Sequence, residues 1–154
     1  MAVRLRGVTG EIPTLVNGIS KLDLGGYEGI PDALLALKEA GASLMVVTSK
    51  PQEMAERVVE HVGLKRFFDA IVGPGREMLS PSKTVLIQRA LALSGARKEE
   101  AVMVGDRKFD IEGAKGAGIA SVGVLYGYGS REELEAAGAD FFADKPEQIK
   151  KFIL

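Results

Sequence analysis

Four polar residues stand where an apolar segment ends or a helix is expected to begin. Thr48 closes the apolar segment 43–48, Lys83 falls in the first turn of a helix expected from Pro81, and Asp106 and Asp110 follow another apolar segment. A lysine in the first helical turn faces the positive end of the helix dipole, which suggests an anion nearby. Carboxylates bind Mg²⁺, whereas a hydroxyl and an ammonium group bind phosphoryl oxygens. Together these residue types predict a site for a phosphate and Mg²⁺.

Each of these residues also has a purely structural interpretation. Asp106 is a candidate N-cap of the following helix, Thr48 a strand terminus and Lys83 a solvated lysine. The prediction of a site therefore rests on the combination of residue types at the ends of neighbouring elements.

The segments around these residues alternate between strand and helix patterns. Strands are predicted at residues 43–48, 70–72, 101–105, 119–125 and 139–143. Helices are predicted at 31–41, 51–63 and 81–95. This alternation predicts an α/β fold, a Rossmann-like three-layer sandwich with a mostly parallel central sheet. Such sheets bind ligands beyond the carboxyl ends of their strands, where Thr48 and Asp106 fall.

The helical patterns also predict buried faces and helix ends. The predicted buried residues are Ile30, Leu34 and Leu37 in the first helix, Met54, Val58 and Val62 in the second, and Val85, Ala90 and Leu93 in the third. Glycines in the left-handed conformation are predicted to end helices at Gly41, Gly63, Gly95, Gly118 and Gly138. Ser130 is predicted to cap the next helix, and Glu133, three residues later, is predicted to bond back to the backbone N–H of Ser130.

Length and composition exclude several classes of protein. We expect one domain over residues 1–154, with residues 1–26 as a divergent N-terminal segment. Twenty basic and twenty-one acidic residues give a net charge of -1, which argues against a nucleic-acid partner. No apolar segment reaches the roughly 18 to 20 residues of a membrane span, so we expect a cytoplasmic protein without a membrane partner. With no cysteine and only His61, thiolate and histidine-cluster chemistry is excluded.

The motifs around the four polar residues resemble those of the haloacid dehalogenase (HAD)-like hydrolases, in particular the phosphoglycolate-phosphatase-like branch. "LMVVTSKP" (44–51) is similar to the second motif, "SK" (82–83) to the third and "VMVGDRKFDIEGAKGAGI" (102–119) to the fourth. The resemblance implies Mg²⁺-dependent hydrolysis of a small phosphate monoester. It also implies roles for individual residues, with Thr48, Ser49 and Lys83 binding the phosphate and Asp106 and Asp110 serving the metal.

The first motif of that family, a strand ending in D-x-D-G-T, has no match. The best alignment, over residues 3–12, places Gly7 at the nucleophile and Thr9 at the general acid/base. Glu11 and Asp23 are the candidate substitutes. Losing the first carboxylate also removes a metal ligand, so we expect a weakened Mg²⁺ site and a lost or altered activity.

The spacing implies a capless site, because the segment between Gly10 and Pro31 is too short for the helical cap domain of capped relatives. A non-catalytic phosphate-binding, Mg²⁺-binding or regulatory protein on the same scaffold remains the main alternative. A further alternative is a response-regulator-like receiver, suggested by Lys145-Pro146. The sequence argues against it, because no phosphorylatable aspartate stands at the end of a central strand in the order that a receiver requires.

Two loop features have open interpretations. The loop "YGYGS" (126–130) is either a phosphate cradle or a helix cap and turn, and Arg76 is either a substrate contact or a solvated loop residue. Substrate and oligomeric state stay open.

Overall fold

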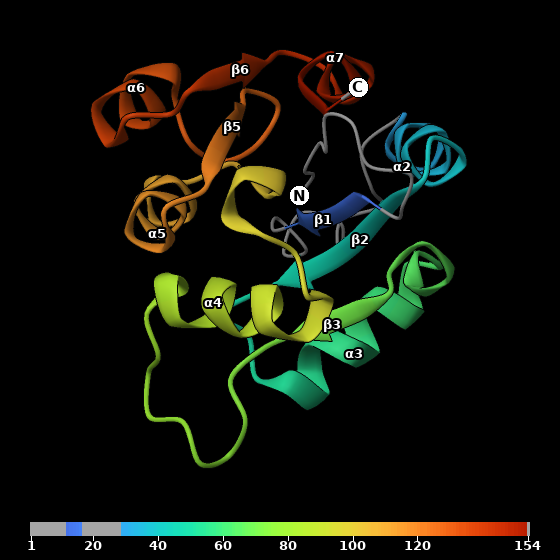
Figure 1. Ribbon diagram of the computed structural model, residues 1–154, viewed down its shortest axis with the longest axis vertical. Helices are drawn as coiled ribbons and strands as arrows, with labels where there is room; N and C mark the ends of the chain where they lie inside the picture. Colours follow the sequence, from blue (N-terminus) through green and yellow to red (C-terminus); the bar gives the residue numbers. More distant parts are fainter. Residues whose placement is uncertain (1–11, 17–28, 154) are drawn as a thin grey trace.

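The protein forms one parallel sheet with helices on both faces (Figure 1). The computed structural model describes residues 12–16, as backbone, and residues 29–153. The six strands stand in the order β3-β2-β1-β4-β5-β6, and every pairing is parallel. Their bounds are β1 Ile12–Val16, β2 Ala42–Val47, β3 Ala70–Val72, β4 Val102–Gly105, β5 Ala120–Val124 and β6 Phe141–Ala143. The predicted α/β, Rossmann-like sandwich is confirmed.

The helices form the two outer layers. Their bounds are α2 Ile30–Glu39, α3 Gln52–His61, α4 Lys83–Ser94, α5 Lys108–Ala117, α6 Arg131–Ala137 and α7 Ile149–Ile153. Three 3₁₀ turns complete the described elements, η1 Lys65–Phe67, η2 Lys98–Glu100 and η3 Pro146–Gln148. The helices α4, α5 and α6 cover one face, and α2, α3 and α7 cover the other (Figure 1). This arrangement follows from right-handed crossovers, because the chain moves from β1 toward β3 first and then crosses to β4.

The register of the central strands brings the predicted site residues to one edge. Val16 at the end of β1 pairs with Val46 in β2 and with Val104 in β4. Thr48 and Asp106 each lie two residues beyond these partners, at the carboxyl edge of the sheet. Because both faces of the sheet are covered, its strands are apolar along their length, as the fully buried Leu44, Val46, Met103 and Val122 show.

The predicted buried face of the first helix is confirmed, whereas those of the other two are confirmed only in part, for Ala90 and for the partly buried Val58 and Val62. Leu34 and Leu37 are buried in α2. In α3 the buried residues are Ala55 and Val59, whereas Met54 is half exposed. The small Ala55 is fully buried, and the prediction overlooked it because it weighted only large apolar side chains.

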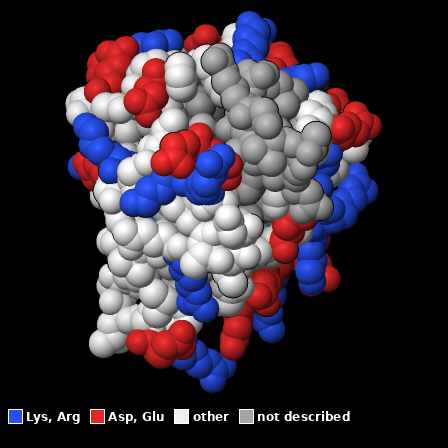
Figure 2. All heavy atoms as spheres, in the orientation of Figure 1, with Lys and Arg blue, Asp and Glu red and all other residues white. Residues whose placement is uncertain are grey.

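The error in α4 has a different cause. Val85 and Leu93 are exposed, whereas Lys83, Leu86, Ile87, Ala90 and Leu91 are buried. Apolar residues surround most of this helix, so periodicity does not define its phase. Figure 2 shows the resulting largely uncharged area over α4, on a surface where acidic and basic side chains otherwise intermingle.

The predicted helix ends are confirmed. All five glycines named above have a positive φ, between 69° and 89°. The hydroxyl of Ser130 accepts a hydrogen bond from the backbone N–H of Glu133 at 3.1 Å, as predicted for the cap of α6. Among the described residues, no helix is long and apolar enough to cross a membrane.

Candidate phosphate and metal site

Lys83 is a buried lysine at the N-terminal end of α4. Its side chain is 7% exposed, and its Nζ lies 3.2 Å from Oδ1 of Asp110. The same ammonium group donates a hydrogen bond to the backbone oxygen of Val47 at 3.4 Å. Ser82 begins the helix by accepting from the N–H of Val85. The contacts of Lys83 join α4 to both β2 and α5, so the interpretation as a solvated lysine is wrong.

Asp110 binds the turn between β4 and α5. Its Oδ2 accepts a hydrogen bond from the backbone N–H of Arg107 at 3.2 Å, and its Oδ1 pairs with Lys83. The residue is fully buried. Arg107 occupies the N-cap position of α5, so the alternative interpretation of Asp106 as the N-cap is also wrong.

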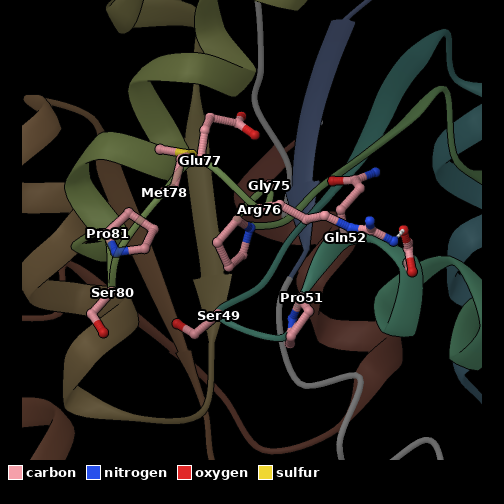
Figure 3. A pocket seen from close by; sticks show the side chains of 11 residues that line it. Ser49, Pro51, Gln52, Gly75, Arg76, Glu77, Met78, Ser80 and Pro81 are labelled. Atoms are coloured by element: carbon pink, nitrogen blue, oxygen red, sulfur yellow. Dashed lines mark hydrogen bonds and ion pairs between the residues drawn. The ribbon is translucent and has the colours of Figure 1, made fainter.

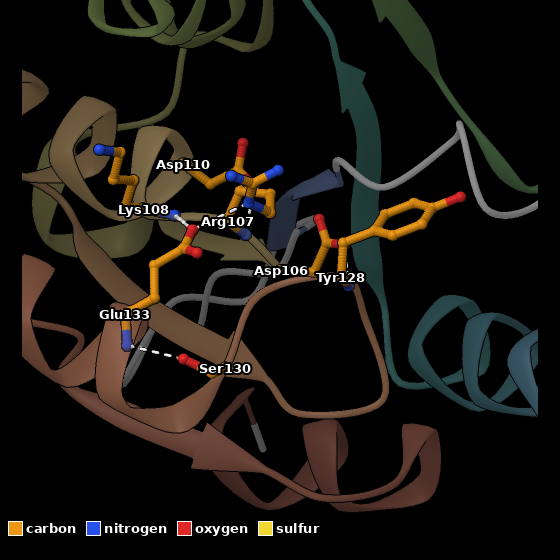
Figure 4. Close-up of polar contacts among 7 residues, drawn as sticks. All are labelled: Asp106, Arg107, Lys108, Asp110, Tyr128, Ser130 and Glu133. Carbon is orange, nitrogen blue, oxygen red and sulfur yellow. Dashed lines mark hydrogen bonds and ion pairs between the residues drawn. The ribbon is translucent and has the colours of Figure 1, made fainter.

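Asp106 is buried directly beyond β4, and the loop 126–130 surrounds it. Its Oδ2 accepts from the backbone N–H of Tyr128 at 2.8 Å (Figure 4). Its backbone oxygen accepts from the backbone N–H of Gly129 at 2.8 Å. The residue is 5% exposed. The N–H groups of Tyr128 and Gly129 thus bond to Asp106 itself, which favours the turn interpretation over a phosphate cradle.

Thr48 lies at the same edge, directly beyond β2. Its backbone N–H bonds to the oxygen of Val72 at 3.0 Å, and its hydroxyl oxygen accepts from the N–H of Lys50 at 3.1 Å. Among the described residues, no side chain or carbonyl takes the hydroxyl proton of Thr48. The buried hydroxyl is therefore able to donate to a ligand. Ser49 is exposed beside it.

Four glycines allow this close packing, and the sequence analysis missed their role. A Cβ on Gly105 would overlap the side chain of Asp110, and one on Gly127 would overlap that of Asp106. On Gly129 a Cβ would meet the backbone oxygen of Asp106, and on Gly113 it would come within 2.6 Å of Cγ of Lys83. No local pattern signals these glycines, because each is required by a residue distant in the sequence or across a turn.

Arg107 and Glu133 form an ion pair beside the buried groups. Nε of Arg107 lies 2.8 Å from Oε1 of Glu133, and that oxygen also accepts from the N–H of Lys108 at 2.9 Å (Figure 4). The hydrogen bond between these two side chains lowers the pKa of Glu133 and raises the pKa of Arg107. The predicted return bond from Glu133 to Ser130 is wrong, because the carboxylate instead attaches α6 to the start of α5.

The donor set at this edge fits Mg²⁺ bound through one carboxylate. Among the described residues, the Asp106 carboxylate accepts a hydrogen bond at Oδ2, and Oδ1 has no hydrogen-bond partner. Within the same residues there is no group of three or more acidic or histidine side chains that could hold a metal ion. Asp110 is instead bound to Lys83 and Arg107. Mg²⁺ is commonly held by one or two carboxylates together with substrate phosphate and water. At this edge Asp106 is the carboxylate that would hold such an ion.

The positions aligned with the first motif lie outside the described residues. Gly7, Thr9, Glu11 and Asp23 all belong to that part of the chain. The central strand β1 ends at Val16, and the first carboxylate after it in the sequence is Asp23.

Comparison with known proteins gives the family. The haloacid dehalogenase-like hydrolase model matches residues 12–124 and thus begins with β1. A 5′-nucleotidase of Pseudomonas aeruginosa is 40% identical over 110 residues, which are 71% of this chain and 50% of that protein. A phosphoglycolate phosphatase of Vibrio parahaemolyticus is 30% identical over 82% of this chain and 56% of its own length.

Solved structures agree with the sequence matches. A crystal structure of a predicted phosphatase from Clostridium acetobutylicum superposes with a TM-score of 0.78 and 38% identity, covering 82% of this chain and 59% of the other. The chain spans about half the length of the curated relatives it matches. It belongs to the haloacid dehalogenase-like hydrolase family, in its phosphoglycolate-phosphatase-like branch.

Proposed function

We propose that this chain binds the phosphoryl group of a phosphate monoester together with Mg²⁺ at the carboxyl edge of β2 and β4. We further propose that turnover through the family's aspartyl nucleophile is lost or altered. The observation that carries the proposal is the buried ammonium group of Lys83, fixed beside the end of β2 by Val47 and Asp110.

The proposed phosphate contacts follow from the hydrogen-bond inventory of the site. An ammonium group has three N–H donors. In Lys83 one faces the Val47 oxygen and another faces Asp110, which leaves a third for a phosphoryl oxygen. The Thr48 hydroxyl supplies a further donor. Because the Lys83–Asp110 pair is neutral, the Asp106 carboxylate remains to attract the metal.

Mg²⁺, when bound, neutralises phosphoryl charge and acts as a Lewis acid. The chain's own contribution is to hold the phosphate between a neutral donor, Thr48, and a cationic one, Lys83. Burial of both residues excludes water from these contacts and strengthens them.

The sequence beyond β1 supports the loss of the nucleophile. In the family, this strand ends in two aspartates. Residues 12–22 contain no aspartate or glutamate, and Asp23 comes seven residues after Val16. The absence of a carboxylate from residues 12–22 supports the proposal that the family's nucleophile is missing from the end of this strand. Phosphate and Mg²⁺ binding needs only the residues that remain.

The test separates binding from turnover. Isothermal titration calorimetry measures binding of inorganic phosphate with and without Mg²⁺, and release of nitrophenol from 4-nitrophenyl phosphate measures hydrolysis. We expect Mg²⁺-dependent phosphate binding without turnover. The variant Asp106→Asn loses the Mg²⁺ dependence, whereas the control Asp140→Asn, whose carboxylate binds Ser121 near the amino end of β5, retains it.

Two outcomes contradict parts of this proposal. If no phosphate binds in the presence of Mg²⁺, the assignment of the site is wrong. Hydrolysis that Asp106→Asn abolishes would show that another carboxylate acts as the nucleophile. Two restoration variants identify the missing position: Asn17→Asp, directly after β1, and Gly7→Asp/Thr9→Asp, the first-motif alignment of the sequence analysis. Gain of hydrolysis in one of them locates the lost nucleophile.

A further inference from the structure

A hollow of about 840 Å³ adjoins the site and has no role in phosphate binding as described above. It lies between the start of α3 and the loop 73–82, which joins β3 to α4 (Figure 3). Ser49, the residue after Thr48, lines it. A phosphate monoester bound at Thr48 therefore has this hollow as space for its leaving group. We call it the β3–α4 hollow.

One wall of the β3–α4 hollow is fixed by hydrogen bonds from Gln52. Its side-chain Oε1 accepts from the N–H of Gly73 at 2.7 Å, and its Nε2 donates to the oxygen of Ile71 at 2.8 Å. Its backbone N–H donates to the oxygen of Pro74 at 3.0 Å. These bonds hold the start of the loop against α3, so this wall is formed before any ligand arrives.

The lining mixes polar and apolar residues, and its apolar residues suit a flat ring. Pro51, Pro74 and Pro81 present rigid faces without N–H donors, and Met78 adds a thioether. Methionine sulfur makes favourable contacts with aromatic rings. An Nη of Arg89 lies 3.4 Å from this sulfur and supports the Met78 side chain from outside. An aromatic group has enough apolar surface to contact these residues, whereas a small hydroxy acid does not.

The charges of the lining disfavour an anionic leaving group. Arg76 lies 2.8 Å from Glu53, so its charge is already paired. Glu77 also lines the hollow and has no ion-pair partner among the described residues. The lining thus carries an excess of one negative charge, which repels a carboxylate such as that of 2-phosphoglycolate.

We propose that the β3–α4 hollow binds the leaving group of the phosphate ester and selects an aromatic, uncharged one over a small anionic one. The proposal rests on the proposed function, since it takes the phosphate to sit at Thr48 and Lys83. It assigns a class of ligand, aryl phosphates, which the geometry of the phosphate site alone does not identify.

Methionine-methyl NMR tests the proposal without requiring turnover. The protein has five methionines, and the variants Met78→Ala and Met54→Ala identify the two relevant methyl signals. Inorganic phosphate, 2-phosphoglycolate and phenyl phosphate are titrated in the presence of Mg²⁺. We expect phenyl phosphate to bind most tightly and to shift the Met78 signal through its ring current. The Met54 signal serves as the control, because Met54 lies on α3 outside the lining.

Two substitutions give opposite expected effects. Met78→Ala weakens phenyl phosphate binding about two- to tenfold and leaves inorganic phosphate unchanged. Glu77→Lys strengthens 2-phosphoglycolate binding about two- to fivefold, the size of an exposed ion pair. Its matched control is Glu39→Lys, at the end of α2 and the opposite edge of the sheet, which leaves the affinity for 2-phosphoglycolate unchanged.

The outcomes separate this inference from the proposed function. If inorganic phosphate binds but phenyl phosphate neither binds more tightly nor moves the Met78 signal, the leaving-group assignment is overturned and the phosphate site stands. If no phosphate compound binds, the phosphate site is wrong, and this inference falls with it.

Discussion

Nζ of Lys83 lies 3.2 Å from Oδ1 of Asp110, and the two side chains are only 7% and 1% exposed. The pair joins the first turn of α4 to the first turn of α5 next to the ends of β2 and β4. Each of the two charges thus faces an opposite charge inside the protein.

Replacing Lys83 by methionine is expected to destabilise the protein by about 3–5 kcal/mol, because it leaves the Asp110 carboxylate buried without its cation. Urea unfolding measures the change in the free energy of unfolding. The double variant Lys83→Met/Asp110→Leu is expected to recover most of the loss, since it removes both charges. If the single and double variants are equally stable, the unpaired charge of Asp110 is not the cause of the loss of stability.

Replacing Gly105 by alanine is expected to destabilise the protein by about 1–3 kcal/mol, the usual cost of overpacking. The added Cβ would overlap the side chain of Asp110, which is held on two sides. Gly75→Ala is the matched control, because the three atoms nearest its added Cβ all belong to the flexible carboxylate end of Glu77. Thermal unfolding compares the two, and equal effects would contradict the close-packing argument.

Asp69 is expected to make the folding stability of the protein depend on pH. Burial would raise its pKa, but hydrogen bonds from Lys38, the N–H of Leu44 and Ser43 outweigh it and hold the pKa below its usual value. The resulting stabilisation is present above the unfolded-state pKa and is lost as the pH falls through the folded-state pKa. Below about pH 4, unfolding experiments should show wild-type stability falling more steeply than that of Asp69→Asn. Parallel pH profiles would contradict this assignment.

Ser130 and Ser82 each accept a hydrogen bond from the N–H three residues later. Replacing either by alanine is expected to cost about 1 kcal/mol of stability. Denaturant unfolding measures both variants. Ser82→Ala should also weaken phosphate binding, because Ser82 begins the helix that carries Lys83, whereas Ser130→Ala should not. An equal effect of both variants on phosphate binding would contradict a specific role for α4.

The residues at strand ends were predictable because their positions depend only on where apolar segments stop. Thr48 and Asp106 follow buried strands, and a parallel sheet brings such positions to one edge. Lys83 was predictable as a candidate from its unfavourable place in a helix, but its burial was not, since that depends on Asp110 across the α4–α5 contact.

Other features depend on contacts between distant residues. The sequence gives no indication that Glu133 pairs with Arg107, 26 positions away, since its local partner Ser130 has the capping spacing. Nor does it show that Gly127 is needed for Asp106, because glycine in a loop has many explanations. In α4, Val85 and Leu93 were mispredicted as buried because apolar residues occur on several sides of the helix, and the inward side includes Lys83.

The central position of β1 also bears on how the protein folds. Thr48 belongs to the half-sheet β2–β3 and Asp106 to the half-sheet β4–β6, and only β1 lies between them. The contact of Val16 with Val104 closes a loop of most of the chain, and such long-range contacts carry a high entropic cost and form slowly. The two halves of the site therefore acquire their final spacing only when this contact is made. The gain of phosphate binding during refolding would then mark the completion of the sheet, and bound phosphate would stabilise the contact that forms last.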